Sequence, residues 1–293
     1  MPTLRYIAAA LCLGWIAVAV SENLFWTVPP PGVTAPGLVV TWLVYALAAA
    51  AGLSAVLMTG ASGLRAAFLG GAVLGYAVEG ALVGTIYEAF PFQLVWTPLA
   101  WHALLSGGLY VGLARTPLRP GAAVAVWSGA ALLALAVALY WPTERAALPG
   151  RGTLALYLVL PMALAVLAHR ALDRLLPLDL PTRGVLLAAP ALLVAVWAVG
   201  TVRDPSVLRL ALWPCLALVL WGLARRASGA VWGGHLPPWQ AALPLFPPVA
   251  VTLFAPPLWA ALGPQATNVV VALTTGPVAL GLLLWAACRR PAA

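Results

Sequence analysis

The sequence contains no lysine and few charged residues of any kind. Only 8% of its 293 residues are charged, with seven acidic side chains and fifteen basic ones that are all arginine. A soluble domain carries roughly 25% charged residues. The chain therefore lacks the polar side chains that a protein needs to face water on all sides, which argues against a soluble fold.

The chain also has no basic stripe or motif of the kind that binds nucleic acid, although its net charge is +8. A nucleic-acid-binding domain gathers its Lys and Arg residues on one face or along one helix. Here the arginines occur in short segments between apolar runs. We interpret them as topology signals and as contacts to lipid head groups, so membrane lipids are the expected partners and nucleic acid is not.

Long apolar runs are abundant instead, with 63% hydrophobic residues and a mean hydropathy of +1.01. In a bilayer only α-helices and closed barrels satisfy every backbone group. Barrel strands alternate apolar and polar residues over about ten positions, whereas these runs continue for about twenty, the length of a membrane-spanning helix. The sequence predicts an all-α, polytopic bundle of ten spans. They cover approximately residues 5–27, 36–59, 64–88, 93–115, 121–141, 153–172, 184–202, 206–226, 238–261 and 265–288.

The distribution of the arginines predicts the orientation of these spans. With the N-terminus in the cytoplasm, the cytoplasmic ends carry Arg5, Arg65, Arg115, Arg119, Arg170, Arg174, Arg183, Arg225, Arg226, Arg289 and Arg290. The opposite ends carry Arg145, Arg151, Arg203 and Arg209. Because positive residues are retained on the cytoplasmic side, this bias predicts that both termini are cytoplasmic, in a multi-pass protein of the bacterial cytoplasmic membrane.

The short connections leave no room for a soluble domain. We expect residues 1–293 to form one integral membrane domain, with helices 1–6 at about 5–172 and helices 7–10 at about 184–288. The ninth span contains five prolines and is expected to be broken, because proline removes a backbone donor. The segment between helices 6 and 7 is the longest connection.

Four ionisable residues fall within the predicted spans, and all are in the first four helices. They are Glu22, Glu79, Glu88 and His102. We expect the other acidic and histidine side chains to lie in or beside loops, namely Glu144, Asp173, Asp179, Asp204, His169 and His235. An ionisable group inside a bilayer is costly, so each buried one is a functional hypothesis.

Glu79 and His102 are predicted to meet. The third and fourth spans form a hairpin, and Glu79 lies about eleven residues before its turn and His102 about eleven after it, so both descend on the order of 15 Å. Two antiparallel neighbours then place both residues at one level near the middle of the bilayer. Gly71 and Gly75 lie on the face of Glu79, and such small residues allow a neighbouring helix to approach closely.

The other two ionisable residues, Glu22 and Glu88, lie near the non-cytoplasmic ends of the first and third predicted spans. Together with Glu79 and His102 they predict a polar funnel that opens outward. Candidate substrate- or ion-binding residues around it are Glu22, Asn23, Tyr87, Glu88 and Trp101. The alternative for His102 and Glu79 is a structural pair that joins two helices.

Three functions remain open from the sequence. In the first, Glu79 and His102 are catalytic residues of a membrane enzyme acting on a lipid or amphiphilic substrate. They act by acid–base chemistry, or with a divalent metal ion as a cofactor held by Glu79, His102 and Glu22. No HExxH, GxSxG or DxxD motif supports a particular reaction.

In the second, the chain is a small-solute or ion-coupled transporter. Ten helices in a chain of this length resemble the topology of drug/metabolite-type transporters, a resemblance that rests on no motif. In the third, the chain is a non-catalytic member of a membrane complex or a homo-oligomer, with helix faces as its contact surfaces.

Overall fold

Helices make up all of the regular structure. The computed structural model describes residues 2–140, 148–225 and 237–288 of the chain. Helix accounts for 83% of the structure, and no strand occurs among these residues. The prediction of an all-α fold is therefore confirmed.

The helical segments follow the predicted spans closely. They are α1 (Pro2–Val18) with η1 (Ala19–Leu24), α2 (Ala35–Thr59), α3 (Gly63–Tyr76) with η2 (Ala77–Leu82), η5 (Trp96–Gly112) with η6 (Leu113–Arg115), α4 (Pro120–Ala138), α5 (Arg151–Leu154) with η8 (Ala155–Val159) and α6 (Leu160–Leu175), α7 (Arg183–Arg203), η9 (Val207–Ala211) with α8 (Leu212–Ala224), α9 (Pro238–Ala242) with η10 (Leu243–Leu245) and α10 (Phe246–Leu262), and α11 (Thr267–Cys288). The expected break in the ninth span is the 3₁₀ turn η10, which joins α9 to α10.

Eight helices in the described residues are long and apolar enough to cross a membrane. The two remaining segments are α3–η2 and η5–η6, which carry Glu79 and His102. These two segments also contain Arg65 and several glycines, which lower their mean hydropathy. The polar pair thus lies on the least apolar helices of the bundle.

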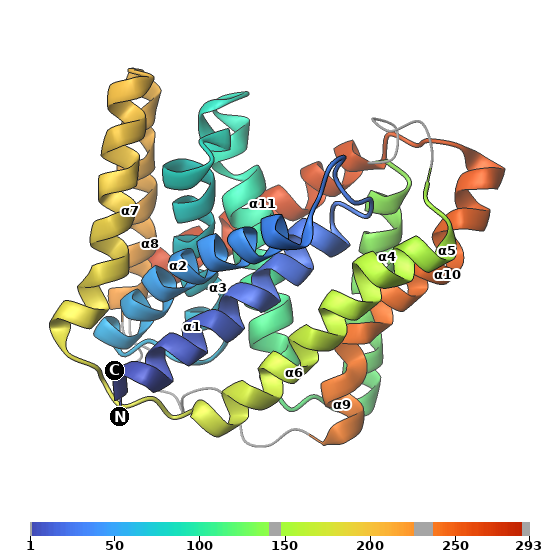
Figure 1. The fold of residues 1–293 in the computed structure, drawn as a ribbon, viewed down its shortest axis with the longest axis horizontal. Coiled ribbons are helices and arrows are strands. Elements are labelled where there is room, and N and C mark those ends of the chain that lie inside the picture. Colours follow the sequence, from blue (N-terminus) through green and yellow to red (C-terminus); the bar gives the residue numbers. More distant parts are fainter. Residues whose placement is uncertain (1, 141–147, 226–236, 289–293) are drawn as a thin grey trace.

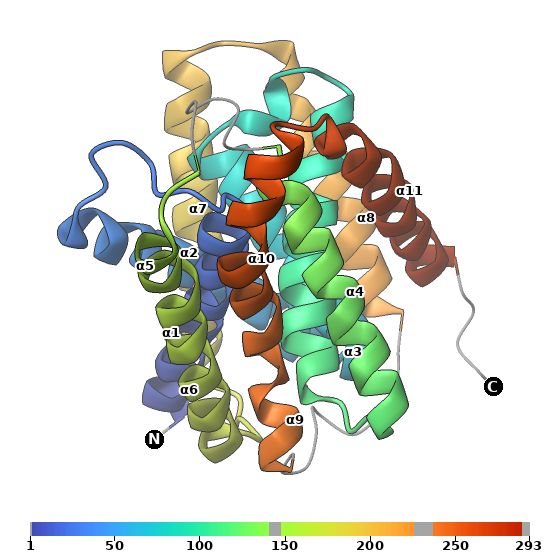
Figure 2. The same ribbon diagram turned by 90° about the vertical axis from the view of Figure 1, so that its right-hand side faces the viewer.

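The bundle is elongated. Figure 1 shows α7 and α8 standing together at one end of the long axis and α5 with α10 at the other, with α1, α2 and α3 between them. The rings of Trp197 and Trp213 join α7 to α8 edge to face, with centroids 4.9 Å apart. In Figure 2, α4 lies beside α10, and the two helices are in contact.

The segments α3 and η5 pack closely because glycine backbones face each other. A Cβ atom on Gly71 would lie 2.9 Å from the Cα of Gly107 and 2.7 Å from the carbonyl oxygen of His102. A Cβ on Gly75 would lie 2.8 Å from the Cβ of His102. Side chains larger than hydrogen would push the helices apart, so these glycines bring the backbones of the hairpin within reach of a Glu79–His102 contact.

The connection between these two helices differs from the prediction. Segment η2 ends at Leu82, and the chain then runs through two short 3₁₀ turns, η3 (Thr85–Tyr87) and η4 (Phe92–Leu94), before η5 begins at Trp96. Gly84 has a φ of +96°, a conformation that glycine adopts without steric cost and that cannot continue a right-handed helix. The predicted span 64–88 was therefore too long, and Glu79 lies one turn from the end of its helix.

The predicted cytoplasmic ends of several helices meet at one pole of the bundle. The guanidinium of Arg5 donates to the carbonyl of Leu175 at 2.5 Å, which joins the start of α1 to the end of α6. Arg65 donates to the carbonyls of Gly222 and Ala286, which joins the start of α3 to the ends of α8 and α11. Residues outside the described ranges include Glu144, Arg145, Arg226, His235, Arg289 and Arg290.

A second charge cluster occupies this pole. It includes His169, which is buried within α6, contrary to the expectation that it lies in or beside a loop, and Asp173, which lies two residues before the end of that helix. Arg115 is 4% exposed and His169 is 8% exposed. Arg115 donates to a carboxylate oxygen of Asp173 at 2.8 Å and to the carbonyl of His169 at 3.1 Å. Arg170 also approaches Asp173, at 3.6 Å. The cluster forms because η6 ends against the last turns of α6, a tertiary contact that helix boundaries do not indicate.

Candidate functional site

Glu79 and His102 form a buried pair between η2 and η5. Nε2 of His102 lies 2.8 Å from Oε1 of Glu79, so the predicted contact is confirmed. The side chain of His102 is 2% exposed and that of Glu79 is 11% exposed. The carboxylate is thus the member of the pair that retains access from outside.

A hydroxyl group completes the surroundings of the Glu79 carboxylate. The Thr85 hydroxyl donates to Oε2 of Glu79. Thr85 belongs to η3, which the chain reaches directly after the positive φ at Gly84. The irregular hairpin therefore folds a hydroxyl back onto the carboxylate, and a straight helix to residue 88 would not do so.

Glu22 joins this site through Tyr45, a residue of α2. The Tyr45 hydroxyl donates to Oε1 of Glu22 and accepts from the Ser21 hydroxyl at 3.4 Å. The ring of Tyr45 lies 5.8 Å from the imidazole of His102, centroid to centroid. A single tyrosine in an alanine-rich helix has the appearance of a packing residue, so sequence reasoning missed it.

The three ionisable side chains of the site all lie on π-helical segments. Glu22 is on η1, Glu79 on η2 and His102 on η5. A π-helical turn inserts an extra residue into the hydrogen-bond ladder of an α-helix, and such turns are frequently found at functional sites. A fourth π-helical segment, η8, contributes Tyr157, whose hydroxyl donates to the carbonyl of Glu22 at 2.8 Å.

Asn23 and Trp101, two further predicted site residues, lie near the Glu79–His102 pair but form no hydrogen bond with it in the described part of the chain. Asn23 is buried and donates from Nδ2 to the carbonyl of Tyr157 at 3.1 Å. Trp101 is buried and stacks between Phe25 and Trp96, with centroid distances of 4.9 and 4.8 Å. These contacts fasten η1 to η8 and to η5 beside the polar cluster.

The hairpin residues Tyr87 and Glu88 lie apart from the pair. Tyr87 donates to the carbonyl of Gly80 at 2.8 Å and accepts from the indole of Trp197 at 3.2 Å. Arg209 lies over its ring at 5.0 Å, so Tyr87 connects the hairpin to α7 and η9. Glu88 is exposed, as suits a residue at the predicted rim of the funnel, but it lies on the connection and not at the end of a helix. The reason is the early end of η2, which leaves Glu88 on the connection.

The predicted metal site is not formed by its three residues. In the described ranges no three side chains of the types His, Cys, Asp and Glu are placed to hold one ion. The carboxylate of Glu22 accepts a hydrogen bond from the Tyr45 hydroxyl, and the ring of Tyr45 packs near the imidazole of His102. The site therefore contains two separate hydrogen-bonded pairs. Glu79 is paired with His102, and Glu22 is paired with Tyr45.

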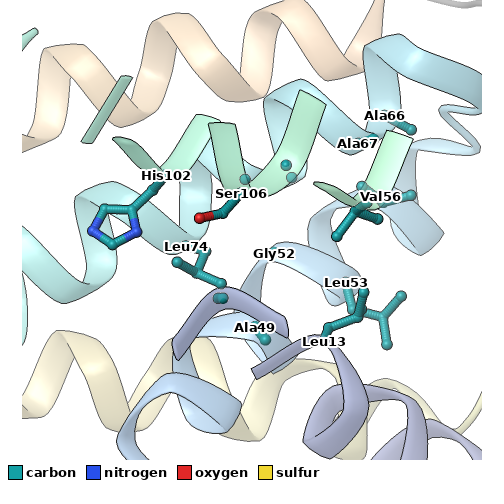
Figure 3. Close-up of a pocket in the computed structure, with 15 residues that line it drawn as sticks. Leu13, Ala49, Gly52, Leu53, Val56, Ala66, Ala67, Leu74, His102 and Ser106 are labelled. Atoms are coloured by element: carbon teal, nitrogen blue, oxygen red, sulfur yellow. The ribbon is translucent and has the colours of Figure 1, made fainter. Parts of the chain in front are cut away.

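A cavity of about 40 Å³ adjoins His102 (Figure 3). Its wall is apolar apart from His102 and Ser106, and includes Leu13, Ala49 and Leu74. Nδ1 of His102 and the hydroxyl of Ser106 are buried and have no hydrogen-bond partner among the described residues. Figure 3 shows the Ser106 hydroxyl pointing toward the side of the His102 ring.

This arrangement orients the imidazole. With the proton of His102 on Nε2, that nitrogen donates to Glu79 and Nδ1 becomes an acceptor. A carboxylate that holds an imidazole in one orientation, with the other nitrogen facing a cavity, is a common arrangement for moving protons. Comparison with protein-family models, curated proteins and solved structures found no match for the chain.

Proposed function

We propose that the chain crosses the bacterial cytoplasmic membrane ten times as a single domain, with both termini in the cytoplasm. The shared pole of Arg5, Arg65 and Arg115 supports this topology, because those residues end helices that the positive-inside rule assigns to one side. The two less apolar segments, α3–η2 and η5–η6, are shielded from lipid by their neighbours.

Single cysteines introduced into a variant without Cys12, Cys215 and Cys288 test the topology. We expect a membrane-impermeant thiol reagent to label cysteines at Gly32 and Asp204 in intact cells, and cysteines at Gly60 and Asp179 only after the membrane is opened. Labelling of the cysteines at Gly60 and Asp179 in intact cells, with none at Gly32 and Asp204, would show the opposite orientation. Any other combination of labelled positions would contradict the proposed number of spans.

We propose that the protein is a membrane enzyme that uses Glu79 and His102 for general acid–base catalysis on a lipid or another amphiphilic substrate. The observation that carries this proposal is the hydrogen-bonded pair itself, buried among apolar helices with only Glu79 partly accessible. A charged pair in such surroundings has a high solvation cost, and hydrophobic side chains of similar volume often join two helices as well.

Separate roles for the two residues follow from their exposure. The Glu79 carboxylate exchanges a proton with the substrate, since 11% of its side chain is accessible. His102 gives up a proton to Glu79 through Nε2 or takes one from it, and Thr85 holds the other carboxylate oxygen in place. Trp101, the neighbour of His102 in the chain, packs between Phe25 and Trp96 in a buried aromatic cluster.

Proton-coupled transport is the second candidate. It is favoured by the helix interruption directly after Glu79, where η2 ends and the chain becomes irregular until η5. Transporters commonly place their ion and substrate sites at such discontinuous helices. The same pair then binds a proton that accompanies a solute, and no bond in the solute changes.

One reconstitution separates these two functions. The purified chain is placed in vesicles made from the membrane lipids of its source organism, with a pH-sensitive dye inside. For an enzyme we expect a lipid species to decrease and a product to accumulate with time and protein amount, measured by mass spectrometry. Solute-dependent acidification with an unchanged lipid profile would support transport. Neither change would contradict both functions.

A further inference from the structure

The segment η5 carries three buried polar atoms that have no hydrogen-bond partner in the described part of the chain, and they occur at a regular spacing. They are Nδ1 of His102, the hydroxyl of Ser106 and the hydroxyl of Tyr110, each four residues from the next. Their residues are 1%, 2% and 1% exposed. Buried polar atoms nearly always have a hydrogen-bond partner, in protein or in water, so three such atoms in sequence require an explanation.

The cavity beside His102 has the size and the polar groups for water. A water molecule needs roughly 10–15 Å³ of space for its centre together with two to four polar partners. The cavity has about 40 Å³, and His102 and Ser106, each with an unpartnered polar atom, are among the residues that line it. Its other lining residues are alanine, glycine, leucine and valine, so water there bonds to these two groups and to other water molecules.

Beyond Ser106, polar groups continue toward the pole where Arg115 lies. Tyr110 packs edge to face against Trp127, at 5.2 Å, and this contact fixes its ring. Both ring nitrogens of His169 are likewise buried without a hydrogen-bond partner among the described residues. Arg115 and Asp173 follow at the end of η6, where the Asp173 side chain is 14% exposed.

We propose that water in this cavity, together with Ser106 and Tyr110, forms a proton route between the Glu79–His102 pair and the Asp173 end of the bundle. The inference rests on the proposed function, because it provides the path for protons that the pair handles. Nδ1 of His102, the acceptor, takes a proton from a cavity water while Nε2 passes its own proton to Glu79. The water regains a proton from the Ser106 hydroxyl, and that hydroxyl regains one from the direction of Tyr110.

Each transfer forms one N–H or O–H bond and breaks another, so the water and the hydroxyls are unchanged, the imidazole carries its proton on Nδ1, and Glu79 has gained one proton. Bulk water supplies that proton near Asp173, the partly exposed group at the end of the route. His169, Arg115 and Arg170 are the other charged or titratable groups that face this end.

Ser106→Val tests the route without any substrate. The protein, with its three histidines labelled with ¹⁵N, is placed in lipid nanodiscs, and a His102→Asn variant identifies the His102 signals. In the wild type we expect magnetisation transfer from water to the His102 ring and rapid exchange of its N–H proton. The added methyl groups of valine fill the cavity, so exchange slows by about tenfold or more.

Ser106→Ala is the matched control, because it removes the hydroxyl and leaves space for water. Magnetisation transfer from water to the His102 ring is expected to persist in this variant.

Tyr110→Phe tests the route beyond Ser106 and retains the ring against Trp127. Slower exchange of the His102 N–H proton, with unchanged magnetisation transfer from water, is expected. Unchanged exchange in Ser106→Val, with helix content preserved, would overturn the hydrated cavity. Unchanged exchange in Tyr110→Phe would overturn the route beyond Ser106. These measurements need no substrate turnover. The proton route can therefore be refuted while the proposed catalysis stands, and the reverse is also possible.

Discussion

Replacing Glu79 by glutamine is expected to abolish the activity of the protein while the chain still inserts and folds. The amide has nearly the same volume as the carboxylate, and its carbonyl oxygen accepts a hydrogen bond from Nε2 of His102, as Oε1 does now. Its amino group meets the oxygen of Thr85, which accepts as well as donates. Packing between η2 and η5 is therefore retained.

The amide cannot take up or release a proton at neutral pH. Removal of a positioned acid or base typically slows a reaction by about 10²–10⁴-fold, and a loss of this size is expected for lipid conversion in the vesicle assay. His102→Ala is expected to cause a similar loss, because Glu79 then lacks its proton partner.

Glu88→Gln is the matched control for this prediction. Glu88 is a carboxylate of the same hairpin but is exposed on the connection, away from the pair. Its substitution is expected to leave activity within about twofold of the wild type, since an exposed charge that does not meet the substrate contributes little. Full activity in both Glu79→Gln and His102→Ala would show that the buried pair only joins two helices.

Asp173→Ala is expected to produce the largest loss of stability. The side chain of Arg115 is 4% exposed and its guanidinium lies 2.8 Å from Asp173. Removing the carboxylate leaves a buried positive charge without a counterion, and breaking a buried pair in this way costs roughly 3–5 kcal/mol. The free energy of unfolding, measured by denaturant titration in detergent, should fall by this amount.

The pair of Arg209 and Asp204 provides the comparison. Their side chains lie 3.1 Å apart, but Asp204 is 77% exposed. Water solvates the charges of such a pair, and exposed pairs contribute about 0.2–1 kcal/mol. Asp204→Ala should therefore lower the free energy of unfolding by less than about 1 kcal/mol. Equal losses in the two variants would contradict the buried character of the Arg115–Asp173 pair.

The meeting of Glu79 and His102 was predicted for a reason that proved only partly right. The prediction assumed that the third helix continues to residue 88 and that the fourth begins at residue 93. These boundaries place the pair near the middle of the bilayer. In the structure η2 ends at Leu82, so Glu79 lies close to the end of its helix. The contact still forms, because Gly71 and Gly75 let η5 approach until the two side chains meet.

Other parts of the site had no counterpart in the sequence. Tyr45 and Ser106 are single polar residues in apolar helices, and their roles depend on which neighbour faces them. The π-helical geometry of η1, η2 and η5 gives no periodic signal that distinguishes it from an α-helix. The Arg115–Asp173 pair joins residues 58 positions apart, and such a contact follows only from the packing of η6 against α6.

By itself the sequence determined the all-helical class of the protein, the approximate positions of its helices and the ionisable residues that they carry. These follow from local quantities, since apolar length, proline and glycine act within a few residues of their positions. The tertiary structure alone decided that Glu88 lies on a connection, that the ring of Tyr45 packs near His102, and that His102 lines a cavity. The rotation and separation of packed helices decide such contacts, and these depend on side chains far apart in the chain.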